Sequence, residues 1–465
     1  MTMNNPFELR HPVVAPPLDP DFRPAALANR AYREAVGDGG APLVIALERE
    51  NNLITRYETR IFPERDRRLE LNTWYAARIV KFLLWQRGGH NIFIGGDEGA
   101  AENIRRSYAN GGELRFERDF FGCQVYEKPL TVTPCTVKSI PPLRESARAL
   151  GRHLDGCRIG FDLGASDRKV SAVVDGKVVF SEETVWEPRK HADPEYHYRE
   201  IMAGLRCAAA HLPRVDAIGG SSAGIYIDNR PMVASLFRSV PPERYGEVRS
   251  LFARIRREWN VPLEVINDGD VTALAGSISI GDGAVLGIAL GSGEAAGYVD
   301  GDGRITGWLN ELGFAQIDDN PDAPPHDWSG DRGCGSQYLS QQCVFRLAPR
   351  AEIEIPAGGT DAERLKFVQQ KLEAGDAGAE KIWQTMGVYL GYAIALYASF
   401  YAIRHVMILG RCTSGLGGGI LFDGAQTVLR KEFPELAESI RLHLPDEKNR
   451  RVGQAVAAAS LPEIS

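Results

Sequence analysis

Apolar and polar positions alternate in several short runs along the chain, and these runs predict paired strands joined by tight turns. One run extends from Val170 to Phe180 and contains Asp175-Gly176, a dipeptide typical of a two-residue hairpin turn. A second run, from Ala284 to Ile305, is interrupted by Gly291-Ser292-Gly293. A third apolar strand, Val406 to Leu409, leads directly into glycines. The pattern therefore predicts an α/β protein with three strand-borne glycine turns.

The first glycine turn has the residues that a bound nucleotide phosphate requires. It runs from Gly164 to Ser166 and follows Asp162, at the end of an apolar strand. Small side chains let backbone N–H groups approach phosphate oxygens. A carboxylate on a rigid strand can hold Mg²⁺ through water, because Mg²⁺ keeps most of its hydration shell. The expected nucleotide and metal-shell residues of the three turns are Asp162, Gly164, Ser166, Lys169, Gly291, Ser292, Gly293, Gly410 and Gly415.

Glycine turns between strands are common, but the order of these three turns distinguishes them from ordinary connections. An Asp precedes the first turn, the second lies between two strands further along, and the third extends from Gly410 to Gly419. This series resembles the phosphate-1, phosphate-2 and adenosine elements of the sugar kinase, hsp70 and actin superfamily. The resemblance covers roughly residues 157–465. It implies two ribonuclease-H-like (actin-like ATPase) lobes around a cleft, with ATP and Mg²⁺ as cofactors.

The pair Asn267-Asp268 ends another apolar strand and precedes a helical run of small residues. Functional sites are often built at such strand ends. The pair resembles the catalytic Asn-Asp of hexokinases and of the ROK (repressor, open reading frame, kinase) sugar kinases. The resemblance implies that Asp268 accepts the proton of the attacking sugar hydroxyl and that Asn267 orients the sugar. Both residue types are also good helix caps, and that alternative stays open.

The segment from Gly307 to Phe314 is similar to the ROK element that ends in Glu-Ile/Leu-Gly-His. The similarity implies that Glu311 binds the sugar, although a surface carboxylate is an equal alternative. The His of the family element is replaced by Phe314. This replacement leaves the identity of the sugar open.

In ROK proteins the same His anchors a structural zinc together with three cysteines, and this chain departs from that pattern. Only Cys334 stands in the corresponding region, with Cys343 further along. Tetrahedral zinc needs four nitrogen or sulfur ligands at suitable spacing. We therefore expect no zinc. The two cysteines also lack the paired spacing of an iron–sulfur cluster.

A small-residue loop, Gly219 to Arg230, stands where ROK chains carry a sugar-contacting Asn. Ser222 and Asn229 are the candidates for sugar contacts on this resemblance. An ordinary Gly-Ser turn and an Asx-type turn are equally good interpretations. The cluster of His191, Asp193 and His197 suggests a metal, but no fourth ligand accompanies it, and a structural role is favoured.

Composition limits the possible compartments and partners. The 465 residues are enough for two or three domains. With 54 basic and 61 acidic residues, the net charge of −7 and the absence of a basic run argue against nucleic-acid binding. Seven scattered cysteines are typical of reduced thiols in a cytoplasmic protein.

No segment of the sequence reads as a targeting or membrane element. Residues 1–6 have neither a basic start nor an apolar stretch of signal-peptide length, so secretion is not expected. The longest apolar run, Val388 to Tyr401, is too short for a membrane span, and its tyrosines repeat at helical steps. We expect it to be a buried helix.

Residues 1–150 do not fit the nucleotide-binding pattern and are expected to form an additional α/β module of unknown role. Its turn at Ile94 to Gly99 either binds an anion or ends a strand, and the second is favoured. The expected elements are strands at 43–47, 54–61, 91–95 and 120–132 and a helix at 71–86. The expected first lobe is 156–280 and the second 281–465, with a terminal helix at 452–460 that returns to the first lobe or the hinge.

Taken with the resemblance, these features predict a divergent ATP-dependent sugar kinase of the ROK and hexokinase type. Two alternatives remain open. One is a sugar-responsive binding or regulatory protein that has lost turnover, and the other is an ATPase that drives a partner protein. A homodimer is common in the families that the chain resembles.

Overall fold

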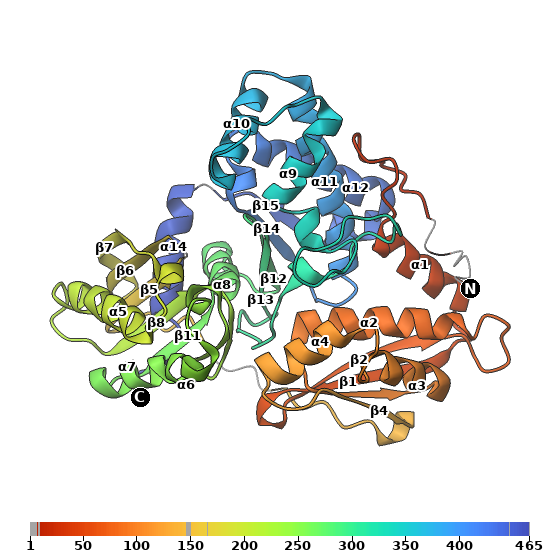
Figure 1. Cartoon of the computed structure of the whole chain (residues 1–465), viewed down its shortest axis with the longest axis horizontal. Coiled ribbons are helices and arrows are strands. Elements are labelled where there is room, and N and C mark those ends of the chain that lie inside the picture. Colours follow the sequence, from red (N-terminus) through yellow and green to blue (C-terminus); the bar gives the residue numbers. More distant parts are fainter. Residues whose placement is uncertain (1–6, 8–9, 146–149, 165, 446, 465) are drawn as a thin grey trace. The chain divides into compact units, whose positions relative to one another are not determined.

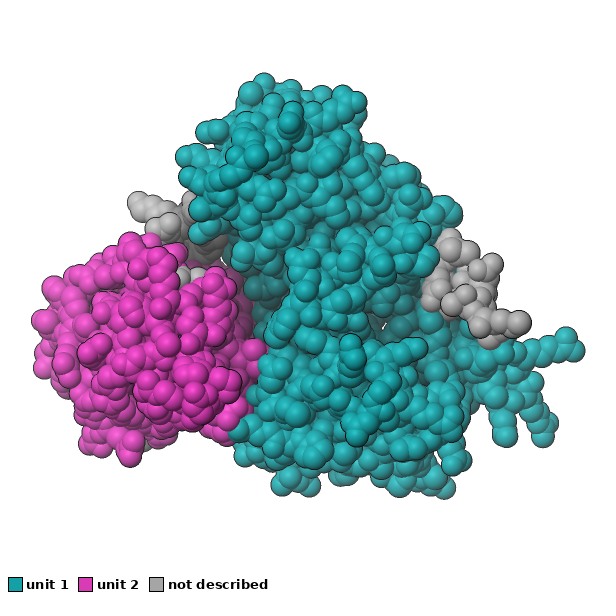
Figure 2. Space-filling view, viewed as in Figure 1, with its two compact units in different colours: residues 1–145, 288–296, 308–444 teal, residues 146–287, 297–307, 445–465 magenta. Residues whose placement is uncertain are grey.

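The chain forms two compact units. The computed structural model describes residues 7, 10–145, 150–164, 166–445 and 447–464, and the residues examined for a leader, 1–6, lie outside this set. Unit 1 comprises residues 1–145, 288–296 and 308–444, and unit 2 comprises residues 146–287, 297–307 and 445–465 (Figure 2). The expected domain boundaries stay a prediction. The amino-terminal residues share a unit with 308–444, whereas the carboxyl-terminal helix belongs to unit 2.

Unit 2 is built on a five-stranded sheet of order β11-β8-β5-β6-β7. The first three strands in sequence are antiparallel, and β8 and β11 are added in parallel on the other side of β5. This is the ribonuclease-H-like strand order. Asp175 and Gly176 both have positive φ, 47° and 76°, which confirms the predicted hairpin turn. The strands are β5 (Cys157–Leu163), β6 (Asp167–Val174), β7 (Lys177–Val185), β8 (Ala217–Ser222) and β11 (Leu263–Asn267).

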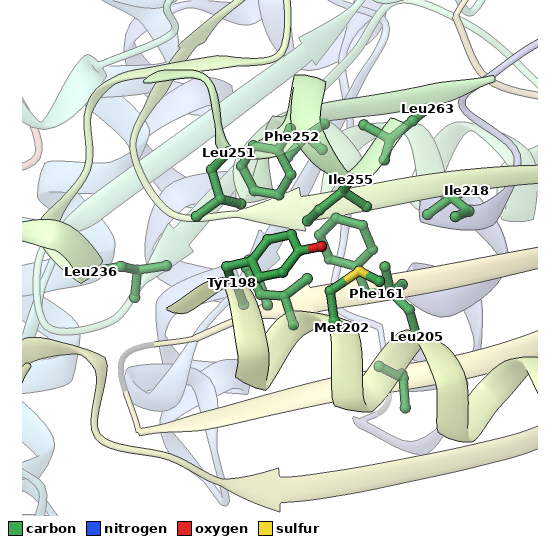
Figure 3. Close-up of a cluster of buried hydrophobic side chains, with 14 of the residues drawn as sticks. Phe161, Tyr198, Met202, Leu205, Ile218, Leu236, Leu251, Phe252, Ile255 and Leu263 are labelled. Carbon is green, nitrogen blue, oxygen red and sulfur yellow. The ribbon is translucent and has the colours of Figure 1, made fainter. Parts of the chain in front are cut away.

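The hydrophobic core of unit 2 lies on the face of the sheet covered by two helices. Helices α5 (Pro194–Ala209) and α7 (Leu251–Trp259) pack there (Figure 1). Phe161 of β5 stacks on Phe252 with ring centroids 6.1 Å apart (Figure 3). Because side chains alternate along a strand, Phe161 faces this core while its neighbour Asp162 faces the other side.

Helix α14 (Glu447–Ala459) packs on the opposite face of the same sheet, which confirms the predicted return of the terminal helix to the first lobe. The contact is close because two glycines lie beneath the helix. A Cβ atom on Gly160 would lie 2.5 Å from the carbonyl oxygen of Ala455, and one on Gly219 would lie 1.8 Å from that of Ala458. Buried Arg158 donates to the carbonyl of Pro462 at 2.7 Å, just beyond the helix end.

Gly219→Ala is expected to destabilise unit 2 by about 3 kcal/mol, because overpacking of a tight core costs roughly 1–3 kcal/mol and here the obstacle is backbone. Gly246→Ala is the matched control. Gly246 lies in helix α6 (Tyr245–Arg249) with nothing within 4 Å of the added methyl group. It should stabilise by about 0.5–1 kcal/mol. Urea unfolding measures the stability of both variants. Equal effects would show that the packing of α14 does not require glycine at position 219.

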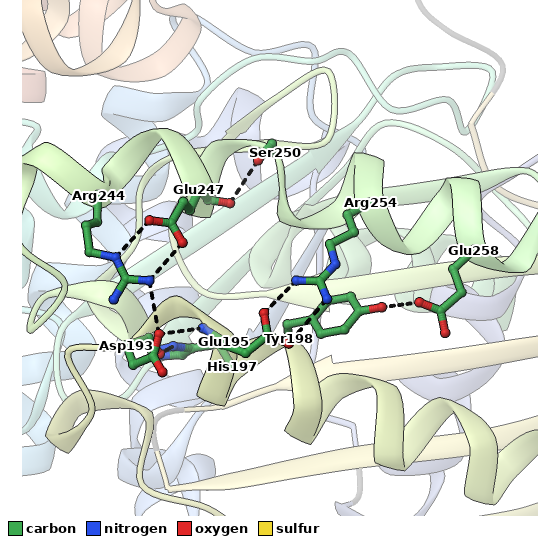
Figure 4. Close-up of polar contacts among 9 residues, drawn as sticks. All are labelled: Asp193, Glu195, His197, Tyr198, Arg244, Glu247, Ser250, Arg254 and Glu258. Atoms are coloured by element: carbon green, nitrogen blue, oxygen red, sulfur yellow. Dashed lines mark hydrogen bonds and ion pairs between the residues drawn. The ribbon is translucent and has the colours of Figure 1, made fainter.

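Polar contacts join α5 to α6 and α7 at the surface of unit 2 (Figure 4). Arg254 lies 2.6 Å from Glu195 and over the ring of Tyr198. Asp193 caps α5 by accepting from the Glu195 N–H and pairs with Arg244 at 3.1 Å. The nitrogens of His197 face the backbone carbonyls of Pro188, Leu236 and Asp193. Asp193 and His197 therefore have structural partners, and the expectation that this cluster holds no metal stays a prediction.

The carboxyl-terminal part of unit 1 surrounds a four-stranded sheet of order β13-β12-β14-β15. Helices α11 and α12 cross closely where Gly387 meets Gly424. All but a few residues of α11 are buried, which confirms the predicted buried helix, and no helix in the described part of the chain is long and apolar enough to cross a membrane. The elements are β12 (Val285–Leu290), β13 (Glu294–Val299), β14 (His405–Leu409), β15 (Arg441–His443), α9 (Gln341–Leu347), α10 (Asp361–Glu373), α11 (Ala377–Tyr397), α12 (Gly417–Glu432) and α13 (Pro434–Ser439).

The amino-terminal part of unit 1 has a second four-stranded sheet, of order β2-β1-β3-β4. The predicted strand over 120–132 is wrong for most of its length, because Phe120–Val125 forms a π-helix that follows α4 and only Thr131–Cys135 forms strand β4. The aromatic residues that suggested a strand pack under Trp85 instead. The other elements are α1 (Ala25–Val36), β1 (Ala41–Glu48), β2 (Ile54–Ile61), α2 (Leu71–Arg87), β3 (Asn91–Gly95), α3 (Glu98–Ser107) and α4 (Arg115–Asp119).

The turn after β3 has a structural explanation. Asp97 caps α3 by accepting from the Ala100 N–H, and its other oxygen accepts from Asn72. Gly96 has φ 128°, and a Cβ there would lie 2.2 Å from the carbonyl of Pro42. The turn therefore ends a strand and begins a helix, in agreement with the favoured interpretation.

Candidate functional site

A row of polar side chains crosses the unit 2 sheet at the level of Asp162. The strand register pairs Asp162 with Ser221 of β8 and Lys169 of β6, and Lys169 with Glu183 of β7. Directly paired residues share a face, so all four lie on the side that α14 covers. They line a cavity of about 160 Å³, to which α14 contributes Gln454. Ser221 was not among the predicted site residues, because only the pairing of β5 with β8 brings it to Asp162.

The charge of Asp162 is set by opposing effects. Burial raises the pKa of its carboxyl group, whereas Lys169 and a hydrogen bond with Ser221 lower it. The Lys169 ammonium lies 3.8 Å from Asp162 and 3.2 Å from Asp167. The ammonium group of Lys169 therefore partly neutralises the charges of both carboxylates, and Lys169 and Asp162 both line the cavity.

The first glycine turn is fastened by a residue that the sequence did not indicate. Gly164 donates its N–H to the carbonyl of Asp167, and Trp186 donates its indole N–H to the carbonyl of Gly164 at 2.9 Å. The backbone N–H of Trp186 donates to the carbonyl of Ser166 at 3.2 Å. Ala165, between them, lies outside the described residues. Trp186 therefore fixes both described ends of the turn.

Asn267 and Asp268 lie at the junction of β11 and helix α8 (Asp268–Ile280), as predicted. The side-chain oxygen of Asn267, Oδ1, accepts a hydrogen bond from the Gly269 N–H at 2.7 Å, so Asn267 is the N-cap of α8. Its amide nitrogen donates to the carbonyl of Gly224 at 2.8 Å. Burial and then the nearby charge of Asp162 raise the pKa of Asp268 to about 6. Asp268 is therefore ionised near neutral pH yet basic enough to accept a proton.

Ser222 and Asn229 occupy positions that their structural interpretations explain. Ser222 is fully buried and accepts a hydrogen bond from the Tyr226 hydroxyl at 2.7 Å. Asn229 turns the hairpin of strands β9 (Ile225–Ile227) and β10 (Arg230–Val233) at φ 63°. Its carboxamide accepts from the Val265 N–H at 2.6 Å and donates to the carbonyl of Leu263 at 3.2 Å. Both polar atoms of Asn229 are thus engaged by β11.

The second glycine turn, in unit 1, connects β12 to β13. Gly291 donates its N–H to the carbonyl of Gly293 at 3.0 Å, and its carbonyl accepts from Gln341 at the start of α9. Ser292 at the tip is exposed. The next residue, Glu294, is buried and was not predicted to matter. Its Oε1 accepts from the Tyr397 hydroxyl at 2.8 Å, whereas Oε2 has no hydrogen-bond partner among the residues that the structure describes. Burial raises the pKa of Glu294 to about 8.

The third glycine turn follows β14 in unit 1. Gly410 has φ 99°, and a Cβ there would lie 2.4 Å from the backbone of Leu290, the residue before the second turn. Only glycine allows β14 and β12 to approach in this way. Gly415, at φ 64°, is exposed shortly before α12 begins.

Residues 308–314, called the Glu311 loop here, lie close to the second turn. Gly313 and Gly293 are both close to the hydroxyl of Ser336, which a Cβ on either would approach to 2.5 and 3.5 Å. Phe314, which replaces the family His, stacks on Trp85 at 4.2 Å between centroids. The structure thus collects the second and third turns and the Glu311 loop in unit 1, and Asp162, Lys169, Asn267 and Asp268 in unit 2.

Cys334 and Cys343 are both buried. Among the described residues, no group of three or more His, Cys, Asp or Glu side chains is placed to hold a metal ion. A water-mediated Mg²⁺ site needs only Asp162 as a protein ligand, so this finding does not bear on it. The expectation that zinc is not bound stays a prediction.

Comparison with known proteins identifies the fold. A ROK hexokinase from Thermus thermophilus is 18% identical, with a TM-score of 0.51, and the match covers 65% of this chain and 98% of that chain. A ROK family transcriptional regulator, a homolog of the E. coli MLC protein, is 20% identical with a TM-score of 0.52, covering 66% and 79%. No curated protein matches significantly. The chain therefore shares the α/β fold of these proteins over about two thirds of its length.

The family follows from a match to a family model. The model of the ROK family matches residues 159–414, which is more than half of the 465 residues. The chain belongs to the ROK family. This match begins only after the amino-terminal sheet of unit 1.

Proposed function

We propose that this protein is an ATP-dependent sugar kinase that transfers the γ-phosphoryl group of Mg-ATP to a sugar hydroxyl. The single observation that carries the proposal is Asp268, a half-buried carboxylate at a strand end whose pKa is raised to about 6 beside Asp162. A regulatory protein has no need of a tuned base, whereas a general base works best with a pKa near the operating pH. Membership in the ROK family is consistent with this activity.

Asp268 accepts the proton of the sugar hydroxyl as that oxygen attacks phosphorus. Asn267 positions Asp268, because its side chain fixes the first turn of α8 and holds the Gly224 loop. The free lone pair of its carboxamide oxygen remains suited to a sugar hydroxyl. Phosphoryl transfer depends mainly on positioning and charge neutralisation, so these two residues need little covalent chemistry.

Each unit carries residues suited to binding part of a nucleotide. Mg-ATP supplies the transferred group and the metal charge that neutralises the phosphate oxygens. Asp162 holds the hydrated metal in unit 2, and the Ser166 backbone N–H and the Lys169 ammonium bind phosphate oxygens beside the turn that Gly164 begins. In unit 1, the N–H groups of Ser292 and Gly293 bind phosphate in the turn that Gly291 begins, the glycines of the third turn support the adenosine, and Glu311 binds the sugar. We also propose a cytoplasmic location, because all seven cysteines are free thiols.

The test is ADP release from Mg-ATP across a panel of hexoses, amino sugars and polyols, with a no-sugar control. Sugar-dependent ADP release is the expected result and identifies the substrate class. ADP release at an equal rate without sugar points instead to a partner-driven ATPase. If no sugar of the panel causes ADP release but sugar binding is retained, the result favours the regulatory alternative.

Ser221→Ala is expected to weaken Mg-ATP binding about tenfold, because Ser221 donates to the Asp162 carboxylate and hydrogen bonds to charged groups contribute roughly 1.5–3 kcal/mol, with the lower end expected for a side chain that is 36% exposed. Losing the bond raises the pKa of Asp162. Ser222→Ala is the control, since that neighbouring hydroxyl contacts Tyr226 instead. Calorimetric titration with Mg-ATP measures both, and indistinguishable affinities would contradict the role given to Ser221.

The sugar-responsive regulatory protein remains the second candidate, and one observation favours it. Phe314 stands where kinases of the family carry His, and a structure with a TM-score of 0.52 to this chain is a transcriptional regulator. The Asp268 variant described in the Discussion separates the two candidates, because a regulator does not depend on proton transfer.

A further inference from the structure

Helix α2 of the amino-terminal segment lies against the part of unit 1 that carries Glu311. Arg78, Lys81 and Trp85 repeat at helical spacing and therefore share one face of α2. The guanidinium of Arg78 lies 2.6 Å from Asp319, and the ammonium of Lys81 lies 2.5 Å from Asp331. The charged side chains of Arg78, Lys81 and Asp319 are all more than four-fifths buried. The face of α2 is therefore anchored to the segment that follows the Glu311 loop.

The last turn of α2 also binds the backbone of the Glu311 loop itself. The Glu311 N–H donates to the carbonyl of Trp85 at 3.0 Å, and the Asn310 N–H donates to the carbonyl of Gln86 at 2.8 Å. Carbonyls in the last turn of a helix have no partner within the helix. The loop supplies these partners, so the end of α2 and the position of Glu311 are fixed by the same hydrogen bonds.

Side chains hold both ends of this short stretch. Asn310 has φ 54°, a left-handed conformation, and its side-chain oxygen accepts from the Tyr401 hydroxyl at 2.9 Å. On the other side of Glu311, the Phe314 ring lies parallel to the Trp85 indole, with 11° between their planes. The backbone around Glu311 therefore has little freedom as long as α2 is in place.

From these contacts we infer that α2 is part of the substrate site and that Trp85 is a positioning residue for the sugar, acting through Glu311. The inference rests on the proposed function, in which Glu311 binds the sugar. It gives a role to residues 1–145, which the family match does not reach. The amino-terminal segment is the support of the sugar-binding loop and not a separable appendage.

Trp85→Leu tests the inference, with Tyr75→Leu as its matched control. Both residues are buried on α2 and each stacks on another aromatic ring, Trp85 on Phe314 and Tyr75 on Tyr32 at 4.0 Å. Trp85→Leu should lower kcat/KM for the sugar about 10- to 100-fold while the KM for ATP changes less than about twofold, since small misplacements of a binding group cost up to about 10²-fold. Tyr75→Leu should lower the stability of the protein without a selective loss of kcat/KM for the sugar.

Hydrogen exchange of the full-length protein gives a second readout that does not need a substrate. Trp85→Leu should speed exchange of the amides of Asn310 and Glu311, and Tyr75→Leu should not. If Trp85→Leu does not fold, Phe314→Leu removes the same stacked pair from the loop side and should give the same pattern.

The outcomes separate this inference from the proposed function. Equal effects of the Trp85 and Tyr75 variants on sugar kcat/KM, or unchanged exchange at Asn310 and Glu311, overturn the inference even if the protein is a kinase. If the wild-type protein phosphorylates no sugar, the proposed function fails. Faster exchange in Trp85→Leu then still supports positioning of the loop by α2, and unchanged exchange rejects it.

Discussion

Asp268→Asn should lower sugar-dependent turnover by roughly 10²–10⁴-fold while leaving sugar and Mg-ATP affinity nearly unchanged, because it removes the general base and keeps the shape of the site. Asn also retains the capacity to begin helix α8, so the fold should persist. Steady-state kinetics and calorimetric binding measure the two effects. A variant that keeps more than about a tenth of wild-type turnover would contradict the role of Asp268, given the size of general-base effects.

The pH dependence supplies an independent check on the same residue. The pKa of Asp268 is raised to about 6, so the base is protonated and inactive below that value. The kcat/KM for the sugar should therefore rise with pH and level off above about pH 6–7, and Asp268→Asn should lack this limb. Asp361→Asn is a suitable control, because Asp361 is an exposed carboxylate at the first position of α10. It should leave rate and pH profile unchanged.

Glu294→Gln should remove a pH-dependent loss of stability. The pKa of Glu294 is raised from 4.5 to about 8 by burial, so the folded protein holds a proton that the unfolded chain releases. Stability from this group is complete below about pH 4.5 and is lost as pH rises toward 8. The slope is about 1.4 kcal/mol per pH unit, and the total loss is about 5 kcal/mol at most.

Urea unfolding of the wild type and of Glu294→Gln, at about pH 5 and about pH 9, measures this difference. The free energies of unfolding of the two proteins should be similar at the lower pH. At the higher pH the wild type should be less stable than Glu294→Gln. Glu34→Gln is the control, because the Glu34 side chain is 69% exposed. Parallel stability curves for wild type and Glu294→Gln would show that the buried carboxyl group is not protonated in the folded protein.

The sequence determined those features whose cause is local. Asp175-Gly176 forms the hairpin turn because both residues tolerate positive φ. Asn267 ends β11 and caps α8 because its side chain reaches the N–H two residues on. Residues 447–459 form a helix, as expected for the end of the chain. Each of these follows from neighbours in the chain or from a repeat of apolar positions.

Local pattern failed where packing gave residues a different role. Phe120 and Phe121 read as strand residues, yet they form a π-helix under Trp85. Asn229 stays a candidate sugar contact, and local pattern did not indicate that its side chain holds a hairpin to β11. In both cases the partner lies 34 or more residues away, so no local signal reports it.

Only the tertiary structure decided the composition of the polar row and the support of the Glu311 loop. Ser221 reaches Asp162 because β8 returns beside β5 in parallel register, and Trp85 reaches Glu311 because α2 ends against residues far along the chain. Burial raises the pKa of Glu294 although its hydrogen bond from Tyr397 lowers it, and neither effect is indicated by its place beside a glycine turn. The sequence by itself indicated the family through its motifs. It also located the glycine turns and the Asn-Asp pair at the end of a strand, because these features depend on local backbone geometry. The environment of each charge depends on which distant strands and helices meet, and that was decided by packing.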